Sequence, residues 1–251
     1  MFCRRATDAP GVPALYLHGI PTSSDDWQEF LVRTGGIAPD LIGFGRSGKG
    51  GHLDYSVAGI TQFVEWFLAE VQVDVVKLVA HDWGVAVGLA LADRHPARVE
   101  RLVLIDAPPL VGGFEWPRLL KVWRKFPFGE ALMGSTTKGL LARTLRSGSV
   151  REDAWPDAHI DAVWHQFDQG TQRAILRLIR SSTVAPLEAP GQAPPTLIIW
   201  GERDPWYPPA LAGAYAARLP GATVERIQDA GHWPWLDRKD LLERIAAFLE
   251  E

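Results

Sequence analysis

The sequence contains a single cysteine, Cys3, so it can form no disulfide within the chain and has no cysteine pair to bind a metal ion. No apolar run approaches the roughly 20 residues that cross a bilayer, and the first residues lack an apolar stretch of signal-peptide length. The net charge is only −4 and the charges are scattered, which argues against a nucleic-acid partner. These absences predict a soluble, cytoplasmic protein that binds neither nucleic acid nor membrane.

The 251 residues, of which 47% are hydrophobic, instead show short apolar runs that alternate with helical patterns. Such alternation predicts an α/β fold with a mostly parallel sheet that is covered by helices on both faces. The predicted strands are 12–18, 75–81, 101–107, 195–201 and 222–228, and the predicted helices are 56–71, 83–96, 208–219 and 239–250.

The alternation stops between about residues 107 and 195, where helical patterns (RLLKVWRKF, HIDAVWHQF and TQRAILRLIRS) occur without a convincing strand. This segment ends in the proline-rich stretch 184–195, after which strands resume. We therefore predict a core domain formed by residues 1–106 and 195–251, and an all-helical cap formed by residues 107–194.

Residues 43–48 match the glycine pattern GxGxxG of nucleotide-binding proteins. A dinucleotide site would run directly into a helix and place an acidic residue about 20 positions later. Here the glycine-rich, turn-like KGGHLDYS follows. The pattern is therefore interpreted as a connecting loop.

The stretch VAHDWGVAVG, residues 79–88, predicts a strand that turns sharply into a helix, with Asp82 at the corner. In such an elbow the corner side chain points away from the sheet edge, and the N–H groups that follow lie at a helix N-terminus. The backbone passes close to the corner, which requires the small residues Ala80, Gly84 and Ala86. An isolated Asp at this position is more often a helix N-cap.

Three further segments are predicted to end at the same edge of the sheet. HGIP, residues 18–21, follows the first predicted strand and can offer a backbone N–H. Asp204 lies in the loop after the penultimate strand, and His232 follows the last one. The chain order of corner residue, acid and histidine is the order of a hydrolytic triad built on such an elbow.

The segments HGIPTSSDDW, APDLIGFGRSGKG, AHDWG, WGERDP and AGHWPWLD span nearly the whole chain. Together they resemble the α/β-hydrolase superfamily, and within it the aspartate-nucleophile branch of haloalkane dehalogenases, epoxide hydrolases and haloacetate dehalogenases. The resemblance implies that Asp82 is the nucleophile, His232 the base and Asp204 the acid that orients the base. One departure is that only about 11 residues precede the first predicted strand, so the usual leading hairpin is expected to be shortened or absent.

Two nearby residues have alternative interpretations. Asp106 ends the strand predicted at 101–107, where some relatives carry the orienting acid, and it competes with Asp204 for that role. His18 is expected to stabilise its own loop rather than to take part in chemistry.

The resemblance implies a two-step reaction. A carboxyl with an ordinary pKa of about 3.9 is ionised at neutral pH, so Asp82 needs no base to attack a saturated carbon and form an alkyl ester. His232, held by Asp204, would then activate water against the ester carbonyl. The backbone N–H groups of Ile20 and Trp83 would form the oxyanion hole.

Epoxide hydrolases of this branch generally protonate the substrate with two cap tyrosines. The four tyrosines here are Tyr16, Tyr55, Tyr207 and Tyr215, and none lies in the predicted cap. Ile179 occupies the cap position where such enzymes often carry a tyrosine. His159 or His165 could substitute, but both are expected to be exposed helical residues. The epoxide interpretation is weakened.

Haloalkane dehalogenases carry a halide-binding tryptophan directly after the nucleophile, where this chain has Trp83. Their second donor is commonly Asn in the first loop, but Ile20 stands there, so a cap tryptophan would have to serve. Of the four in the cap (Trp116, Trp123, Trp155 and Trp164), we select Trp164, whose alternative role is apolar packing. Haloacetate dehalogenases place arginines beside the nucleophile, and Trp83 and Ala86 occupy that stretch.

The sequence thus predicts a haloalkane-dehalogenase-like hydrolase that needs no cofactor or metal and acts on a small apolar substrate and water. The alternative is an epoxide hydrolase with the same Asp82–His232–Asp204 triad. A non-catalytic ligand-binding protein of this fold is a further alternative, and an ordinary esterase is disfavoured because Asp82 replaces serine. The oligomeric state stays open.

Overall fold

A computed structural model describes residues 1–6, 11–112, 114–182 and 193–251. The described residues form one seven-stranded sheet in the order β1-β3-β2-β4-β5-β6-β7. The strands are β1 (Cys3–Ala6), β2 (Ala14–Leu17), β3 (Gly36–Pro39), β4 (Val76–His81), β5 (Val99–Ile105), β6 (Thr196–Gly201) and β7 (Thr223–Ile227). All neighbouring pairs are parallel except β1 and β3, which are antiparallel.

The start of the sheet differs from the sequence prediction. The first strand was predicted at 12–18, but β1 precedes it and pairs with β3, which was also not predicted. Each of these strands has four residues. β1 carries the charged Arg4 and Arg5, and β3 reads GIAP, so neither shows an apolar run or an alternating pattern. Among the described residues, β1 precedes β2 and forms the antiparallel edge of the sheet.

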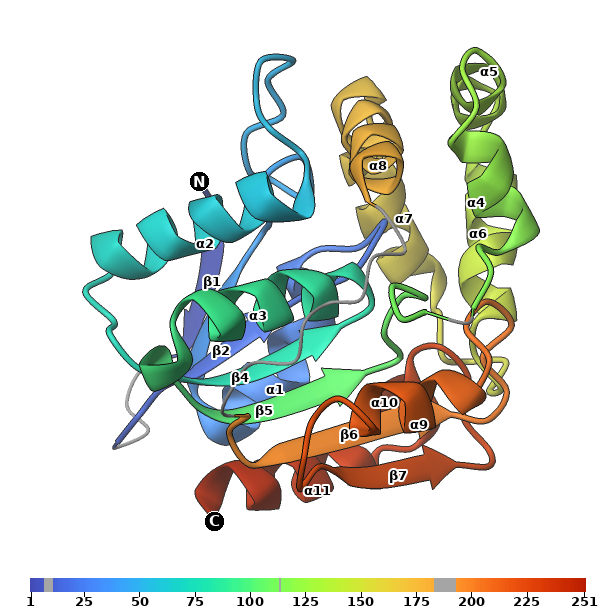
Figure 1. Ribbon diagram of the computed structural model, residues 1–251. Coiled ribbons are helices and arrows are strands. Elements are labelled where there is room, and N and C mark those ends of the chain that lie inside the picture. The colour runs from blue at the N-terminus through green and yellow to red at the C-terminus, as the bar shows by residue number, and fades with distance from the viewer. Residues whose placement is uncertain (7–10, 113, 183–192) are drawn as a thin grey trace.

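Helices cover both faces of the sheet, as predicted. In Figure 1, α2 (Val57–Glu70) and α3 (Trp83–Arg94) lie on one face, whereas α1 (Gln28–Thr34) and α11 (Asp240–Glu250) lie on the other. The core domain also contains α9 (Ala210–Ala216), α10 (Pro234–Asp237) and two 3-10 helices, η1 (Ser24–Trp27) and η2 (Pro96–Arg98).

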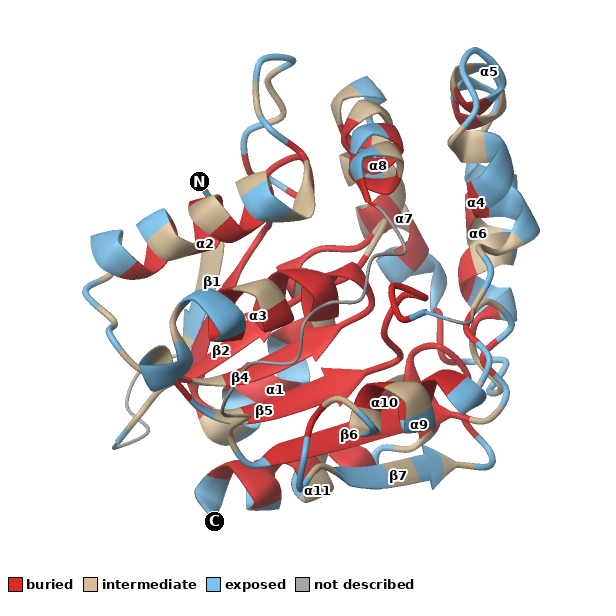
Figure 2. Cartoon of the chain, viewed as in Figure 1, coloured by how far each residue is buried: buried red, intermediate tan, exposed pale blue. Residues whose placement is uncertain are grey.

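The central strands are the most deeply buried part of the molecule (Figure 2). Every residue of β2 and β6 is buried, because helices or neighbouring strands contact them on all sides. The edge strand β7 is half-exposed. A buried parallel sheet of this kind holds the loops at its carboxyl edge in fixed positions.

Between β5 and β6, the described residues form helices and no strand. The helices are α4 (Arg118–Trp123), α5 (Phe128–Gly134), α6 (Lys138–Ser147), α7 (Asp157–Gln166) and α8 (Gln169–Ser181). They stand beyond the carboxyl ends of the strands (Figure 1). Helical patterns predicted α4, α7 and α8, whereas α5 and α6 were not predicted. The proline-rich stretch lies almost entirely outside the described residues, so the boundaries of the cap stay a prediction.

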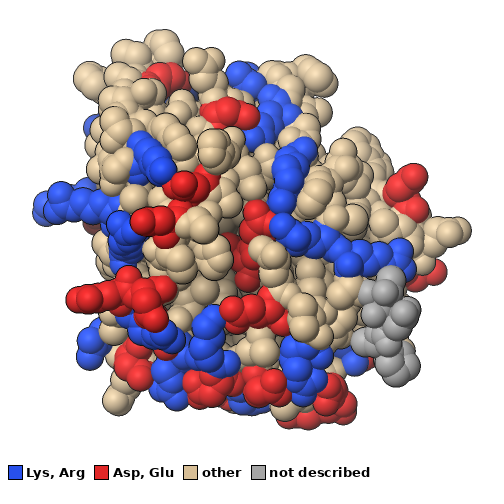
Figure 3. Space-filling view, turned by 180° about the vertical axis from the view of Figure 1, so that it is seen from behind, with Lys and Arg blue, Asp and Glu red and all other residues tan. Residues whose placement is uncertain are grey.

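The GxGxxG pattern at 43–48 forms turns, as predicted, and no helix follows it directly. Among the described helices none has the length and apolar character that a bilayer crossing requires. Acidic and basic side chains are interspersed over the face seen from behind (Figure 3), in keeping with a net charge of −4.

Candidate active site

Asp82 sits at the turn between β4 and α3 with φ 49° and ψ −124°. A positive φ is unfavourable for a residue other than glycine, and such strain concentrates at functional sites. Although Asp82 occupies the N-cap position of α3, its side chain makes no capping hydrogen bond. Its Oδ2 accepts a hydrogen bond of 2.9 Å from the N–H of Ile20, and its Oδ1 is buried without a partner among the described residues. The carboxylate is therefore available for chemistry.

Glycine is required where the first loop passes Asp82. A Cβ on Gly19 would lie 2.5 Å from the Cβ of Asp82 and 2.6 Å from its Oδ2. A Cβ on Gly84 would lie 2.4 Å from the carbonyl oxygen of Leu17. These close approaches bring the N–H of Ile20 within hydrogen-bond distance of the carboxylate.

We expect Gly19→Ala to reduce turnover about 100-fold, because the added methyl group must displace Asp82 from the N–H of Ile20 and a shift near 1 Å has this cost. Steady-state kinetics with the best substrate measure the effect. Gly48→Ala is the matched control, since a Cβ there meets nothing within 4 Å. Equal activity of the two variants would contradict the role given to this contact.

His232 and Asp204 form a buried pair in which the His232 Nδ1 and the Asp204 Oδ2 are 2.7 Å apart. The other carboxylate oxygen of Asp204 accepts the backbone N–H groups of Trp206 at 2.7 Å and Tyr207 at 3.0 Å. Burial alone would lower the pKa of His232, but the charge and the hydrogen bond of Asp204 outweigh burial and raise it. The imidazole is thus oriented by Asp204 and made more basic.

Burial raises the pKa of the Asp82 carboxyl above its ordinary value. The charge of His232, the N–H groups of Ile20 and Trp83 and the hydroxyl of Tyr207 oppose this effect. The sequence predicted an ordinary pKa because composition and spacing do not reveal how completely the carboxyl is enclosed. The anion is therefore stabilised by its neighbours rather than by water.

His81, which precedes the elbow, is a supporting residue that the sequence analysis missed. Its Nε2 lies 2.8 Å from the carbonyl oxygen of His232, and the two rings are 4.7 Å apart. Burial holds the pKa of His81 well below its usual range, so the ring is neutral and donates from Nε2. His18 stabilises its own loop, as predicted, through its Nδ1, which lies 2.8 Å from the carbonyl oxygen of Gly19. Its Nε2 accepts the N–H of Leu41, in the loop after β3, at 2.9 Å.

The loop that carries His232 is also bonded to the cap. The backbone N–H of His232 donates to the carbonyl oxygen of Gly148, at the end of α6, at 2.7 Å. Asp237 accepts the N–H groups of Val150 and Arg151 through one oxygen and that of Gly231 through the other, each at 2.8 Å. The position of the histidine therefore depends on the cap.

Asp106 lies beside the pair rather than apart from it. Its Oδ1 accepts the N–H of Gly201 at 3.0 Å, and burial, followed by the charge of Asp204, raises its pKa well above the usual range. Asp106, Asp204 and His232 each place one atom within 4.8 Å of the others, and they are the group among the described residues that could hold a metal ion. Asp204 is already bonded to His232, and Asp106 is bonded to the N–H of Gly201, so both carboxyl groups serve contacts within the protein.

Asp82 and His232 open into a cavity of about 330 Å³ between the core and the cap. Its lining is mostly apolar, and its polar members include Asp82, Tyr207 and His232. The lining residues are Ile20, Pro21, Asp82, Pro117, Leu119, Leu120, Trp123, Leu132, Met133, Thr136, Leu140, Leu141, Thr144, Leu145, Phe167, Ile175, Trp206, Tyr207, His232 and Trp233. Such a cavity fits a small apolar molecule.

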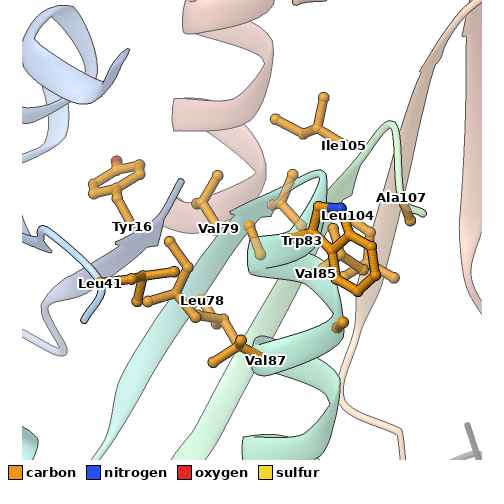
Figure 4. Close-up of a cluster of buried hydrophobic side chains, with 14 of the residues drawn as sticks. Tyr16, Leu41, Leu78, Val79, Trp83, Val85, Val87, Leu104, Ile105 and Ala107 are labelled. Carbon is orange, nitrogen blue, oxygen red and sulfur yellow. The ribbon is translucent and has the colours of Figure 1, made fainter. Parts of the chain in front are cut away.

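The structure does not bring the predicted halide-binding indoles to this cavity. The side chain of Trp83 belongs to the buried cluster that includes Leu104 and Ala107 (Figure 4), and it stacks on Trp116 at 6.0 Å. Trp164 packs on Phe167, with ring centroids 6.3 Å apart, and does not line the cavity. Spacing along α7 does not reveal which way its residues face, and Trp123 is the cap tryptophan that reaches the lining.

The other candidate donors from the cap also lie elsewhere. His159 and His165 are exposed and do not line the cavity. Ile179 is fully buried, and Ile175, one turn earlier in α8, is the lining residue. Tyr207, which the sequence analysis passed over because it lies outside the cap, does line the cavity.

Comparisons with known proteins agree with this geometry. Residues 13–239 match the family model described as the alpha/beta hydrolase fold. A haloalkane dehalogenase from Mesorhizobium japonicum is 30% identical and aligns over 97% of this chain and 86% of its own length. Epoxide hydrolase 1 of Caenorhabditis elegans is 26% identical over 94% of this chain and 64% of its own length.

Solved structures show the same fold. Cfl2 from Burkholderia cenocepacia superposes with a TM-score of 0.86 at 22% identity, covering 98% of this chain and 91% of that one. An epoxide hydrolase from Bacillus megaterium, solved with an inhibitor, gives 0.85 at 21% identity, covering 100% and 96%. The elbow, the sheet and the matching family model together define the class: the chain belongs to the α/β-hydrolase family. Within that family it lies in the branch of haloalkane dehalogenases and epoxide hydrolases.

Proposed function

We propose that this protein hydrolyses the carbon–halogen bond of small apolar molecules through a covalent ester on Asp82. The observation that carries the proposal is the Asp82 carboxylate itself. One of its oxygens is bonded to Ile20, and the other is buried without a partner in the part of the chain that the structure describes. Both lie in an apolar cavity that His232 also lines. If the carboxylate only stabilised the backbone, its oxygens would accept capping hydrogen bonds from the N–H groups of α3.

In the first step, Asp82 Oδ1 attacks the carbon that carries the halogen. A C–O bond forms, the carbon–halogen bond breaks, and the halide leaves with the bonding electron pair. Oδ2 stays bonded to the N–H of Ile20 and becomes the carbonyl oxygen of the ester. The apolar walls hold the substrate and exclude most of the water that would otherwise solvate the nucleophile.

In the second step, His232 removes a proton from water, and the hydroxide attacks the carbonyl carbon of the ester. The negative charge that develops on the carbonyl oxygen is stabilised by the N–H groups of Ile20 and Trp83. When this intermediate collapses, the bond from the carbonyl carbon to the alkyl oxygen breaks, and that oxygen leaves with the electron pair and takes the proton of the added hydroxyl group. Asp82 returns to a carboxylate, the alcohol is released, and His232 gives up the proton that it took from water. Ester formation removes the charge of Asp82, one of the causes that raise the pKa of His232. Ester formation therefore lowers the pKa of His232 and favours the neutral imidazole, the form that can accept a proton from water.

Epoxide hydrolysis is the second candidate, and Tyr207 is the observation that favours it. Opening of an epoxide needs an acid on the ring oxygen. A tyrosine hydroxyl in the cavity beside Asp82 can supply one, although it comes from the core rather than from the cap. Relatives of both kinds align with this chain.

A substrate panel separates the two candidates. We expect halide release from short bromoalkanes at rates well above those for styrene oxide hydrolysis, and loss of both activities in Asp82→Asn. Ion chromatography measures the halide, and chiral chromatography measures the diol. Activity on epoxides alone would reverse the order of the two functions.

A further inference from the structure

We propose that the hydroxyl of Tyr207 is a catalytic hydrogen-bond donor that stabilises the leaving group when Asp82 attacks. The inference rests on the function proposed above and adds a residue to it. Tyr207 lies in the loop after β6, three positions beyond Asp204, and its side chain lines the cavity together with Asp82 and His232.

One group beside the Asp82 carboxylate has no role in the steps described so far and could act as donor to the leaving group. Four of them lower its pKa: the imidazole of His232, the N–H groups of Ile20 and Trp83, and the hydroxyl of Tyr207. The two N–H groups serve the oxyanion, and the imidazole serves the water. The Tyr207 hydroxyl is the remaining donor of these four groups, and it and the carboxylate shift each other's pKa.

Contacts with two residues of the triad, Asp204 and His232, fix the position of Tyr207. Its backbone N–H donates to Asp204 Oδ1 at 3.0 Å, and its carbonyl oxygen accepts the indole N–H of Trp200 at 3.1 Å. The ring packs edge-on against His232, with centroids 5.2 Å apart. Only 4% of the residue is exposed. The hydroxyl is therefore fixed in the same frame as the acid and the base.

The hydroxyl also keeps its proton. Burial raises the pKa of Tyr207 well above its ordinary value, and the charge of Asp82 raises it further. Burial and the charge of Asp82 thus favour the O–H form of the group, and a donor aimed at developing negative charge in a dry site is a major source of catalysis.

The tryptophans do not fill this role in the same way. Trp83 and Trp164 are not among the residues that line the cavity, although the Nε1 of Trp83 is buried without a partner among the described residues. Trp123 does line the cavity, with its Nε1 buried and without a partner among the described residues. It offers a second donor from the cap, so loss of the Tyr207 hydroxyl should slow the first step rather than abolish it.

The chemistry balances for both substrate classes. With an alkyl halide, the halide takes the electron pair of the broken bond and accepts a hydrogen bond, and the Tyr207 O–H bond stays intact. With an epoxide, the ring oxygen takes the electron pair and the tyrosine proton. The phenolate then recovers a proton from His232, which gained it from the attacking water, and the cycle closes with the diol.

The test isolates the first step. In a His232→Gln background, in which the ester is expected to accumulate, intact-mass measurements over time give its rate of formation. Tyr207→Phe keeps the ring and removes the hydroxyl. Tyr215→Phe is the matched control, because its hydroxyl is buried and donates to the carbonyl oxygen of Pro108 at 2.6 Å, away from the cavity.

We expect Tyr207→Phe to slow ester formation about 10- to 100-fold with a chloroalkane, and less with the matching bromo- and iodoalkane, because the poorer leaving group depends most on the donor. Tyr215→Phe should leave the rate unchanged. An equal effect on all three halides, or no effect, would overturn the role of Tyr207 while the observed ester upheld Asp82 as nucleophile. Absence of any ester with any substrate would overturn both.

Discussion

Replacing His232 with glutamine should stop the reaction halfway and leave an alkyl ester on Asp82. The variant keeps the carboxylate, the N–H of Ile20 and the apolar cavity, which are the parts needed for the first step. It lacks the base that drives water onto the ester. We expect the intact mass to rise by the alkyl group of the substrate and steady-state turnover to fall by about 10⁴-fold or more.

Peptide mapping should locate the added mass at Asp82. The double variant Asp82→Asn with His232→Gln is the control, since it keeps the cavity but has no carboxylate to alkylate. A mass increase in that control, or an adduct on another residue, would show that Asp82 is not the nucleophile. A protein that turns over substrate normally without His232 would refute the second step.

The second large effect is expected at Asp204. Asp204→Asn removes the charge that orients His232 and stabilises its protonated form, so turnover should fall about 10³- to 10⁴-fold. Because Asp204 raises the pKa of His232, and only the neutral imidazole accepts a proton, activity is lost as pH falls through that pKa. In Asp204→Asn the pKa is lower, so this acid limb should move to lower pH. A pH–rate profile measures both changes.

Asp106→Asn is the matched comparison for Asp204→Asn. Burial and the charge of Asp204 raise the pKa of Asp106 and so disfavour its charged form, and asparagine carries no charge. We therefore expect little change in turnover and no shift of the acid limb. The reverse pattern, with Asp106→Asn inactive and Asp204→Asn active, would assign the role of orienting acid to Asp106.

The residues at the carboxyl edge of the sheet were predictable because each directly follows a strand. Asp82 stands at a strand–helix corner among small residues, whereas Asp204 and His232 follow two later strands, and parallel strands bring such positions together. The elbow and the shared edge of the sheet therefore follow from local pattern. β1 and β3 were missed because four residues are too few to show a period.

The lining of the cavity was less predictable. Which side of each cap helix faces inward depends on how the cap packs. Trp164, on α7, lies outside the cavity, whereas Trp123, on α4, lies in its wall. Tyr207 was not predicted, because the resemblance to epoxide hydrolases places the phenol donors in the cap. Its place three residues after Asp204, in a loop already tied to the triad, was the available signal.

The bond between the His232 N–H and the Gly148 carbonyl, together with the three N–H groups held by Asp237, has a consequence for the exchange of parts between relatives. A cap taken from a relative and joined to this core would preserve the position of His232 only if it reproduced the backbone course of residues 148–151. We therefore expect single substitutions on α4, α5 and α6 to change the substrate range of this protein more easily than replacement of the whole cap.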